Sequence, residues 1–262
     1  MFYWIYDYPT WSMGALFAAV FVAVTWLGIF VLRPTVVSWI HSRRPANDIV
    51  GLGLSSFSVP FGLLLGLLAV ASYQNFSTVS DLVDREASCL AALHRDFTGY
   101  PEPVRTQLQD RLGEYVRFTI EEAWPQQRRG IVPQGGSQRI NAVFDILSRF
   151  EPASKGQEII HAEALRQFTL LVETRRSRLA NVTTGLPAVL WWIVTFGALV
   201  NITLIWLLDA EISVHMIVGG VLAAFLGVVI FLIAALDNPF RGELSVGPDS
   251  IAAVYDNWTK VH

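Results

Sequence analysis

The sequence is poor in charged residues. Only 16% of its 262 residues are charged and 53% are hydrophobic, whereas an average globular chain carries about 25% charged residues. The deficit is local, because the stretch between Ser77 and Thr184 is densely charged while four other segments contain almost no charge. The net charge of −3 provides no basic field, so nucleic acid is not expected as a partner.

The sequence also lacks the residue patterns that carry most enzymatic and metal chemistry. Cys89 is the only cysteine, which excludes an intrachain disulfide and a cysteine-rich metal site. None of the five histidines has a histidine, cysteine or carboxylate partner at metal-ligand spacing, so no zinc site is expected. A P-loop, a Gly-x-Ser-x-Gly elbow and an HExxH motif are absent too. We therefore expect neither a cofactor nor an enzymatic activity.

Four long apolar segments dominate what is present. They cover roughly residues 13–32, 50–72, 186–208 and 212–236. A helix of about 20 residues crosses the ~30 Å of hydrocarbon in a bilayer, and each segment is about that long. The sequence therefore predicts an all-α, polytopic membrane protein with four transmembrane helices, whose first partner is the lipid bilayer.

The four segments form two pairs, which divides the chain into parts. We expect a first transmembrane pair in residues 1–75, a soluble insert in 76–184, and a second pair, joined as a tight hairpin, in 185–237. Residues 238–262 form a turn and an amphipathic tail. Four spans place both termini and the insert on one side, and the Lys and Arg residues near the span ends weakly favour the cytoplasmic side.

The insert has the pattern of a helical bundle. Apolar residues recur every three or four positions, as in Val79, Leu82, Leu90, Leu93 and Phe97, which is typical of amphipathic helices. Prolines at 101 and 103 are expected to break the first helix, and the Trp124-Pro125 pair to end the second.

The second span differs from the others in its small residues. It contains four glycines, and Pro60 and Gly62 near its middle mark a possible kink or hinge. Small residues let membrane helices pack closely, but a kinked helix with serines also suits the wall of a water-filled path. The two interpretations are nearly even. The polar residues are Ser55, Ser56 and Ser58.

Ionisable residues are missing from the middle of the spans. Only His215, near the start of the fourth, lies within one. Proton-coupled transporters normally need such groups, so their absence counts against a transporter. A pore with an apolar constriction does not need them, because a hydrophobic narrowing gates by dewetting.

Several short motifs, in order, resemble a known family. They are Arg43-Arg44 with Asn47 before the Gly-rich span, Tyr115 with Glu122-Ala123-Trp124-Pro125, Arg175-Arg176-Ser177-Arg178-Leu179, Leu186-Pro187 with Leu190-Trp191, and Leu236-Asp237-Asn238-Pro239-Phe240-Arg241-Gly242. Together they resemble the bacterial bestrophin-like membrane proteins over nearly the whole chain. The layout is also distantly similar to bestrophin anion channels, whose acidic calcium-binding run this sequence lacks.

The resemblance implies a fold and a function. Bestrophins are pentameric anion channels with four spans per subunit, a cytosolic helical insert and a pore lined by the second span. The resemblance thus implies a homo-oligomer in a bacterial inner membrane that conducts inorganic ions, chloride above all. Constriction candidates at helical spacing on span two are Phe57, Phe61, Leu64 and Leu68.

Charged residues next to the spans have structural or functional interpretations. Asp237 and Arg241 are candidates for an ion pair at the end of the fourth span, with Pro239 and Gly242 in the turn between and after them. Three further arginines are expected either to meet acidic residues of the insert or to shape an anion vestibule. They are Arg175, Arg176 and Arg178.

An alternative function class stays open. The insert could bind a partner while the spans serve only as an anchor, as in a membrane-bound sensor or assembly protein. A ring of four or more subunits with an axial opening would favour the channel, and a monomer, or a dimer without such an opening, would favour the anchor.

Overall fold

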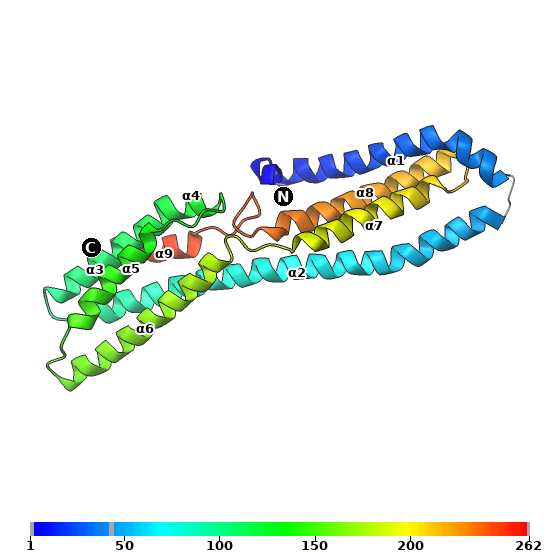
Figure 1. Cartoon of the computed structure of the whole chain (residues 1–262). Coiled ribbons are helices and arrows are strands. Elements are labelled where there is room, and N and C mark those ends of the chain that lie inside the picture. Colours follow the sequence, from blue (N-terminus) through cyan, green and yellow to red (C-terminus); the bar gives the residue numbers. More distant parts are fainter. Residues whose placement is uncertain (1–2, 42–44, 261–262) are drawn as a thin grey trace. The chain divides into compact units, whose positions relative to one another are not determined.

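The computed structural model describes residues 3–41 and 45–260, and every regular element in these two ranges is a helix (Figure 1). Arg43 and Arg44 of the predicted connector lie outside the described residues. Four helices are long and apolar enough to cross a membrane, which confirms the predicted all-α architecture with four spans. These four are α1 (Thr10–His41), α2 (Pro45–Phe97), α7 (Ala188–Trp206) and α8 (Ile212–Asp237).

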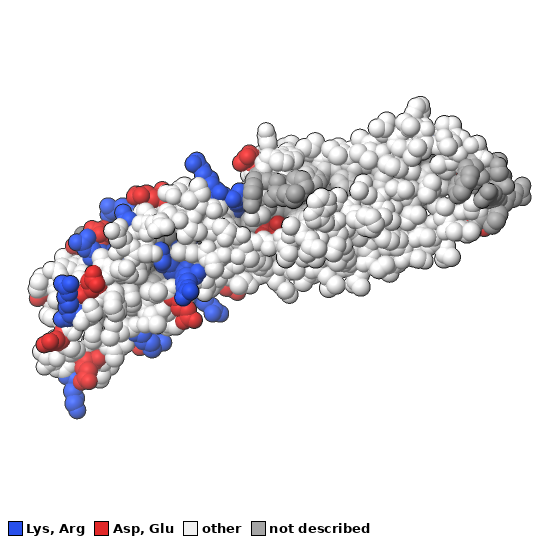
Figure 2. Space-filling model, in the orientation of Figure 1, with Lys and Arg blue, Asp and Glu red and all other residues white. Residues whose placement is uncertain are grey.

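The chain divides into two compact units. The membrane unit comprises Met1–Asn75, Gly185–Asp237 and Gly242–Leu244, and the insert unit comprises Phe76–Thr184, Asn238–Arg241 and Ser245–His262. Helix α2 contributes to both. On the face drawn in Figure 2, charged side chains gather over the helices of the insert unit and are nearly absent from the spans.

Helix α8 is the most buried of the four spans, and it packs along α1 through small residues. A β-carbon at Gly227 would lie 2.8 Å from the carbonyl oxygen of Phe17, so only glycine allows the two backbones to come this close. Since apolar burial gives little driving force inside a bilayer, this close van der Waals contact is what holds α1 and α8 together.

Side chain–backbone hydrogen bonds join the ends of the spans. The Asn47 amide donates to the Asp209 carbonyl oxygen at 3.2 Å and accepts from the Asp209 N–H at 2.9 Å, which ties the start of α2 to the loop between α7 and α8. In the same loop region, a ring nitrogen of His215 lies 2.9 Å from the carbonyl oxygen of Ile205. The only ionisable residue predicted within a span is therefore engaged with backbone.

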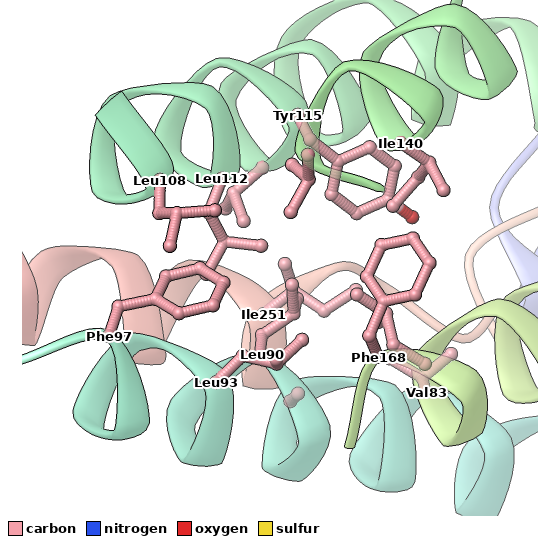
Figure 3. Close-up of a cluster of buried hydrophobic side chains, with 14 of the residues drawn as sticks. Val83, Leu90, Leu93, Phe97, Leu108, Leu112, Tyr115, Ile140, Phe168 and Ile251 are labelled. Atoms are coloured by element: carbon pink, nitrogen blue, oxygen red, sulfur yellow. The ribbon is translucent and has the colours of Figure 1, made fainter. Parts of the chain in front are cut away.

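The insert unit is a bundle of helices around one apolar core. Beside the second half of α2 it contains α3 (Val104–Phe118), α5 (Gly135–Arg149), α6 (Lys155–Ala180) and α9 (Asp249–Lys260). Figure 3 shows Leu90, Leu112 and Ile251 from three of these helices pointing into a common centre. Helix α6 begins at Ser154, whose hydroxyl accepts the Gln157 N–H at 3.3 Å as an N-cap.

Helix α9 belongs to this core. Ile251 is fully buried, and the Trp258 ring stacks on His94 of α2 at 4.3 Å between centroids. On the other side, Arg117 of α3 donates to the Tyr255 hydroxyl at 3.0 Å. The predicted amphipathic tail is thus a core helix of the insert unit.

The prediction that Trp124-Pro125 ends the second insert helix is wrong. The chain continues through one π-helical turn, η2 (Thr119–Ala123), into α4 (Trp124–Gln127). The Trp124 N–H bonds to the Thr119 carbonyl, five residues back. Pro125 then lies in the first turn of α4, so the helix passes through this proline and ends at Gln127.

Candidate functional site

Helix α2 has two contrasting faces within the membrane unit. Phe61, Leu65 and Leu68 are only 5–6% exposed and pack in an apolar core with residues of α7 and α8. The opposite side is exposed, with Leu52 at 69%, Val59 at 74% and Leu63 at 65%. We call this side the open face of α2; it consists of Asp48, Leu52, Ser55, Ser56, Val59, Leu63, Gly66 and Val70.

The predicted constriction residues lie on the packed face. Phe61 is seated on Gly197 of α7, where a β-carbon would overlap its ring, and Phe57 stacks on Phe61 at 5.7 Å. Leu64 packs against the same core as Leu68. Apolar residues at helical spacing predict a packed stripe as readily as a pore lining. In this structure the stripe packs against α7 and α8, and its role as a constriction stays a prediction.

The predicted serine wall is divided between the two faces. Ser58 accepts a hydrogen bond from the Asn201 amide of α7 at 2.9 Å, whereas Ser55 and Ser56 are exposed. The Ser55 hydroxyl donates to the Gly51 carbonyl at 2.9 Å within its own helix. Two of the three serines are therefore available to whatever faces the open side of α2.

The hinge candidates also lie at the exposed side. Pro60 and Gly62 are exposed, and α2 continues through both without a break in the helix. A β-carbon at Gly62 or Gly66 would have no neighbouring atom within 4 Å. The glycines of α2 are thus not needed for packing inside this chain.

In the insert unit, Arg178 forms a buried ion pair with Glu86 of α2. The Arg178 Nε donates to Glu86 Oε2 at 2.5 Å and Nη2 donates to Oε1 at 3.2 Å, with both side chains at most 2% exposed. The third nitrogen, Nη1, donates to Gln127 Oε1 at 2.6 Å. Tyr115 donates its hydroxyl proton to Glu86 at 2.6 Å. All three guanidinium nitrogens therefore have an acceptor.

The environment of this ion pair is apolar, and it affects the pKa values of Arg178 and Tyr115. The Trp124 ring lies 4.8 Å from the guanidinium carbon of Arg178. Burial on its own would lower the pKa of Arg178, but the adjacent Glu86 carboxylate more than offsets this, so that the pKa is raised. Burial also raises the pKa of Tyr115, with Glu86 adding to the effect. The group is a closed structural centre rather than an ion-binding surface.

The other two arginines of the motif lie closer to solvent. Arg175 is partly buried and reaches the Ser137 hydroxyl at 3.4 Å, with its guanidinium 6.0 Å from the Tyr115 ring. Arg176 is exposed. A vestibule role for either of them stays a prediction.

The residues after α8 form the predicted turn. The Arg241 N–H bonds to the Asn238 carbonyl at 3.0 Å, which places Pro239 at the second position of a β-turn, where proline is favoured. Gly242 has a φ of +82°, a conformation that favours glycine.

The two charged residues of this segment have backbone partners. Asp237 accepts the Leu186 N–H at 2.5 Å and also a hydrogen bond from the Trp191 side chain. The Arg241 guanidinium donates to the Arg129 carbonyl at 2.8 Å. The ion pair between Asp237 and Arg241 stays a prediction.

Sequence reasoning missed Glu86 as the partner of Arg178. A signal was present, because residues 79, 83, 86, 90, 93 and 97 fall every three or four positions on one side of α2, and five of these six are apolar. A carboxylate on a buried stripe requires a positive partner. The sequence alone does not say which arginine supplies it.

Comparisons with known proteins agree with this architecture. A family model described as "Bestrophin-like domain" matches residues 19–251. A crystal structure of a point variant of a bacterial bestrophin homologue from Klebsiella pneumoniae aligns with a TM-score of 0.70 at 13% identity, covering 92% of this chain and 97% of that chain. A second crystal structure of the homologue, phased with zinc, gives 0.70 at 13% identity with coverages of 94% and 97%. A search of the curated proteins found no match.

Proposed function

Because the chain belongs to the bestrophin-like family, we propose that it is a homo-oligomeric ion channel of the bacterial inner membrane, a pentamer that conducts inorganic anions such as chloride. In this proposal α2 of each subunit lines the pore and the insert lies in the cytoplasm. The established part is coarser: the chain is a multi-pass membrane protein with the bestrophin fold.

The observation that carries the proposal is the open face of α2. From Asp48 to Val70 it is exposed, with no packing partner among the residues that the structure describes, and it carries no charge after Asp48. An uncharged wall with apolar side chains at mid-span suits a pore that is gated by dewetting. Ser56 adds a hydroxyl donor that can replace part of the hydration shell of a permeating anion, whereas the Ser55 proton is bonded to the Gly51 carbonyl.

This geometry moves the expected constriction to the other side of α2. Val59 and Leu63, the most exposed apolar side chains near the middle of the span, replace the stripe of Phe57, Phe61, Leu64 and Leu68 in the proposal. Phe61 and Leu68 instead support the wall from behind by packing on α7 and α8.

Cysteine modification tests both the conduction and the lining face. The sole cysteine is first removed by Cys89→Ser, so that a single new cysteine can be placed at will. Purified Leu63→Cys protein in vesicles should conduct, and a charged methanethiosulfonate reagent should block most of the current. The matched control is Leu65→Cys, two residues away but 5% exposed, which the reagent should leave conducting.

Three outcomes would count against the proposal. An absence of ion flux through the reconstituted Cys89→Ser protein, with a monomer seen by size measurement, favours a membrane anchor whose insert binds a partner. Flux that is blocked at Leu65→Cys but not at Leu63→Cys would return the pore to the packed face of α2, which carries the predicted stripe. Equal current carried by potassium and chloride would remove the anion preference.

A further inference from the structure

The membrane unit contains an apolar groove that conduction does not require. It lies between α1 and α7, with α8 beneath it, and has a volume of about 460 Å³. Its walls include Val20 and Val24 of α1 and Leu199 of α7, and its floor includes Ala198 and Ala234, whose small side chains leave the space open. We call it the α1–α7 groove.

The polar groups on the α7 side of the groove already have partners in the chain. The one hydroxyl, that of Thr195, donates to the Trp191 carbonyl at 2.8 Å. The Trp191 indole, at one end of the groove, has the Asp237 carboxylate as its partner. Away from the indoles of Trp4 and Trp191 at one end, the walls offer an occupant almost only hydrocarbon, so an apolar chain suits the groove better than a polar ligand.

The position and length of the groove match one leaflet of a bilayer. Along α7 it runs from Trp191 to Ile202, which is about 16 Å at 1.5 Å per residue. Half of a ~30 Å hydrocarbon core is about 15 Å. Trp4 of the short helix η1 (Tyr3–Asp7) and Trp191 lie at the same end of the groove. Tryptophan prefers the headgroup level, so this end marks the edge of the leaflet.

A transmembrane helix of a second subunit fits these dimensions poorly. Such a helix crosses both leaflets and needs a contact surface along about 20 residues. The groove ends near Val24, about halfway along the first span, and near Ile202, about one turn before α7 ends at Trp206. A single flexible chain that enters at the headgroup level and ends near the bilayer centre is the occupant that matches this length.

We propose that the α1–α7 groove is a binding site for one acyl chain of a membrane phospholipid, drawn from the leaflet on the side of the insert and the termini. The chain packs between Val20 and Leu199 over the Ala198 and Ala234 floor. Its ester and headgroup lie at the level of Trp4 and Trp191. The site holds whether or not the protein conducts ions.

Photocrosslinking of the purified full chain tests the site. The probe is phosphatidylglycerol with a diazirine on its acyl chain, mixed into phosphatidylcholine vesicles, and labelled peptides are mapped by mass spectrometry. We expect labelling concentrated on residues 16–24. Leu199→Trp fills the groove from an exposed position and should reduce that labelling about tenfold, which corresponds to about 1.4 kcal/mol of lost packing.

Phe196→Trp is the matched control. Phe196 is on the same helix and is 66% exposed, but it does not line the groove, so the labelling of residues 16–24 should stay unchanged. Val20→Trp is the second variant, used if Leu199→Trp fails to fold. It fills the groove from the opposite wall, and it should likewise reduce labelling, which is then read on the α7 segment 191–202.

Two results would overturn the proposal. One is labelling spread evenly over the exposed faces of all four spans. The other is a groove that stays unlabelled in the unaltered protein while Leu199→Trp changes the oligomeric state, which would show that a second copy of this chain covers it.

Discussion

Glu86→Gln should destabilise the insert far more than the loss of an exposed carboxylate does. Glu86 and Arg178 are the only fully buried ion pair among the described residues, and Arg178 would keep its charge when Glu86 loses its own. Removing one member of a buried pair costs about 3–5 kcal/mol, since it leaves an uncompensated charge in an apolar site.

The size of the effect can be stated as a melting temperature. One kcal/mol shifts the Tm of a domain of this size by about 2–4 °C, so Glu86→Gln should lower it by about 6–20 °C. Arg178→Gln should act similarly by leaving the carboxylate unpaired. The double variant leaves no buried charge. Its loss of unfolding free energy should therefore be smaller than the summed losses of the two single variants, by a coupling energy of about 0.5–3 kcal/mol.

Thermal unfolding of the full chain in detergent measures this. Glu163→Gln is the control: its pair with Arg166 lies on the surface, with side chains 41% and 59% exposed. Exposed pairs contribute at most about 1 kcal/mol. The reasoning is refuted if Glu86→Gln and Glu163→Gln lower Tm equally, or if the double variant shows no coupling.

Two further predictions concern the insert unit and one concerns the membrane unit. Burial lowers the pKa of His161 below its usual 6.5, and its ring nitrogen lies 2.8 Å from the Tyr100 hydroxyl. Because the unfolded chain then binds a proton at a higher pH than the folded chain does, stability is lost as the pH falls through the pKa that His161 has in the folded chain. Tm should therefore drop more between about pH 7.5 and about pH 5 in the unaltered protein than in His161→Gln, and an equal drop would contradict this. Ile251→Ala should cost about 2–5 kcal/mol by leaving a cavity, while Asn257→Ala, on the exposed side of α9, should leave Tm unchanged. If α2 lines the pore, Asp48→Asn should raise the anion-to-cation permeability ratio about twofold or more, because a carboxylate near a pore entrance repels anions. The reversal potential in a salt gradient measures this ratio. An unchanged reversal potential would place Asp48 away from the ion path.

The spans were predictable because their signal is local. Length and hydropathy suffice to place a transmembrane helix, and the structure has α8 at Ile212–Asp237 where the sequence predicts residues 212–236. The end of the first insert helix was likewise visible, because prolines at 101 and 103 follow α2, which ends at Phe97.

The orientation of each helix was not predictable from such signals. The stripe through Phe61 and the open face through Leu63 are both apolar, so hydrophobicity does not decide which one meets α7. What decides it is the fit of Phe61 on Gly197, and that depends on two residues more than 130 positions apart. The same holds for Arg178, whose partner lies 92 positions earlier in the chain.

The burial of Ile251 has a consequence for the order in which the protein is made. The insert is encoded between the second and third spans, but its core is completed by α9, which follows the fourth. A ribosome therefore synthesises the α7–α8 hairpin before the last helix of the soluble bundle. The insert core can close only after all four membrane segments have been synthesised. A chain that is truncated before α9 lacks Ile251 and keeps this core open.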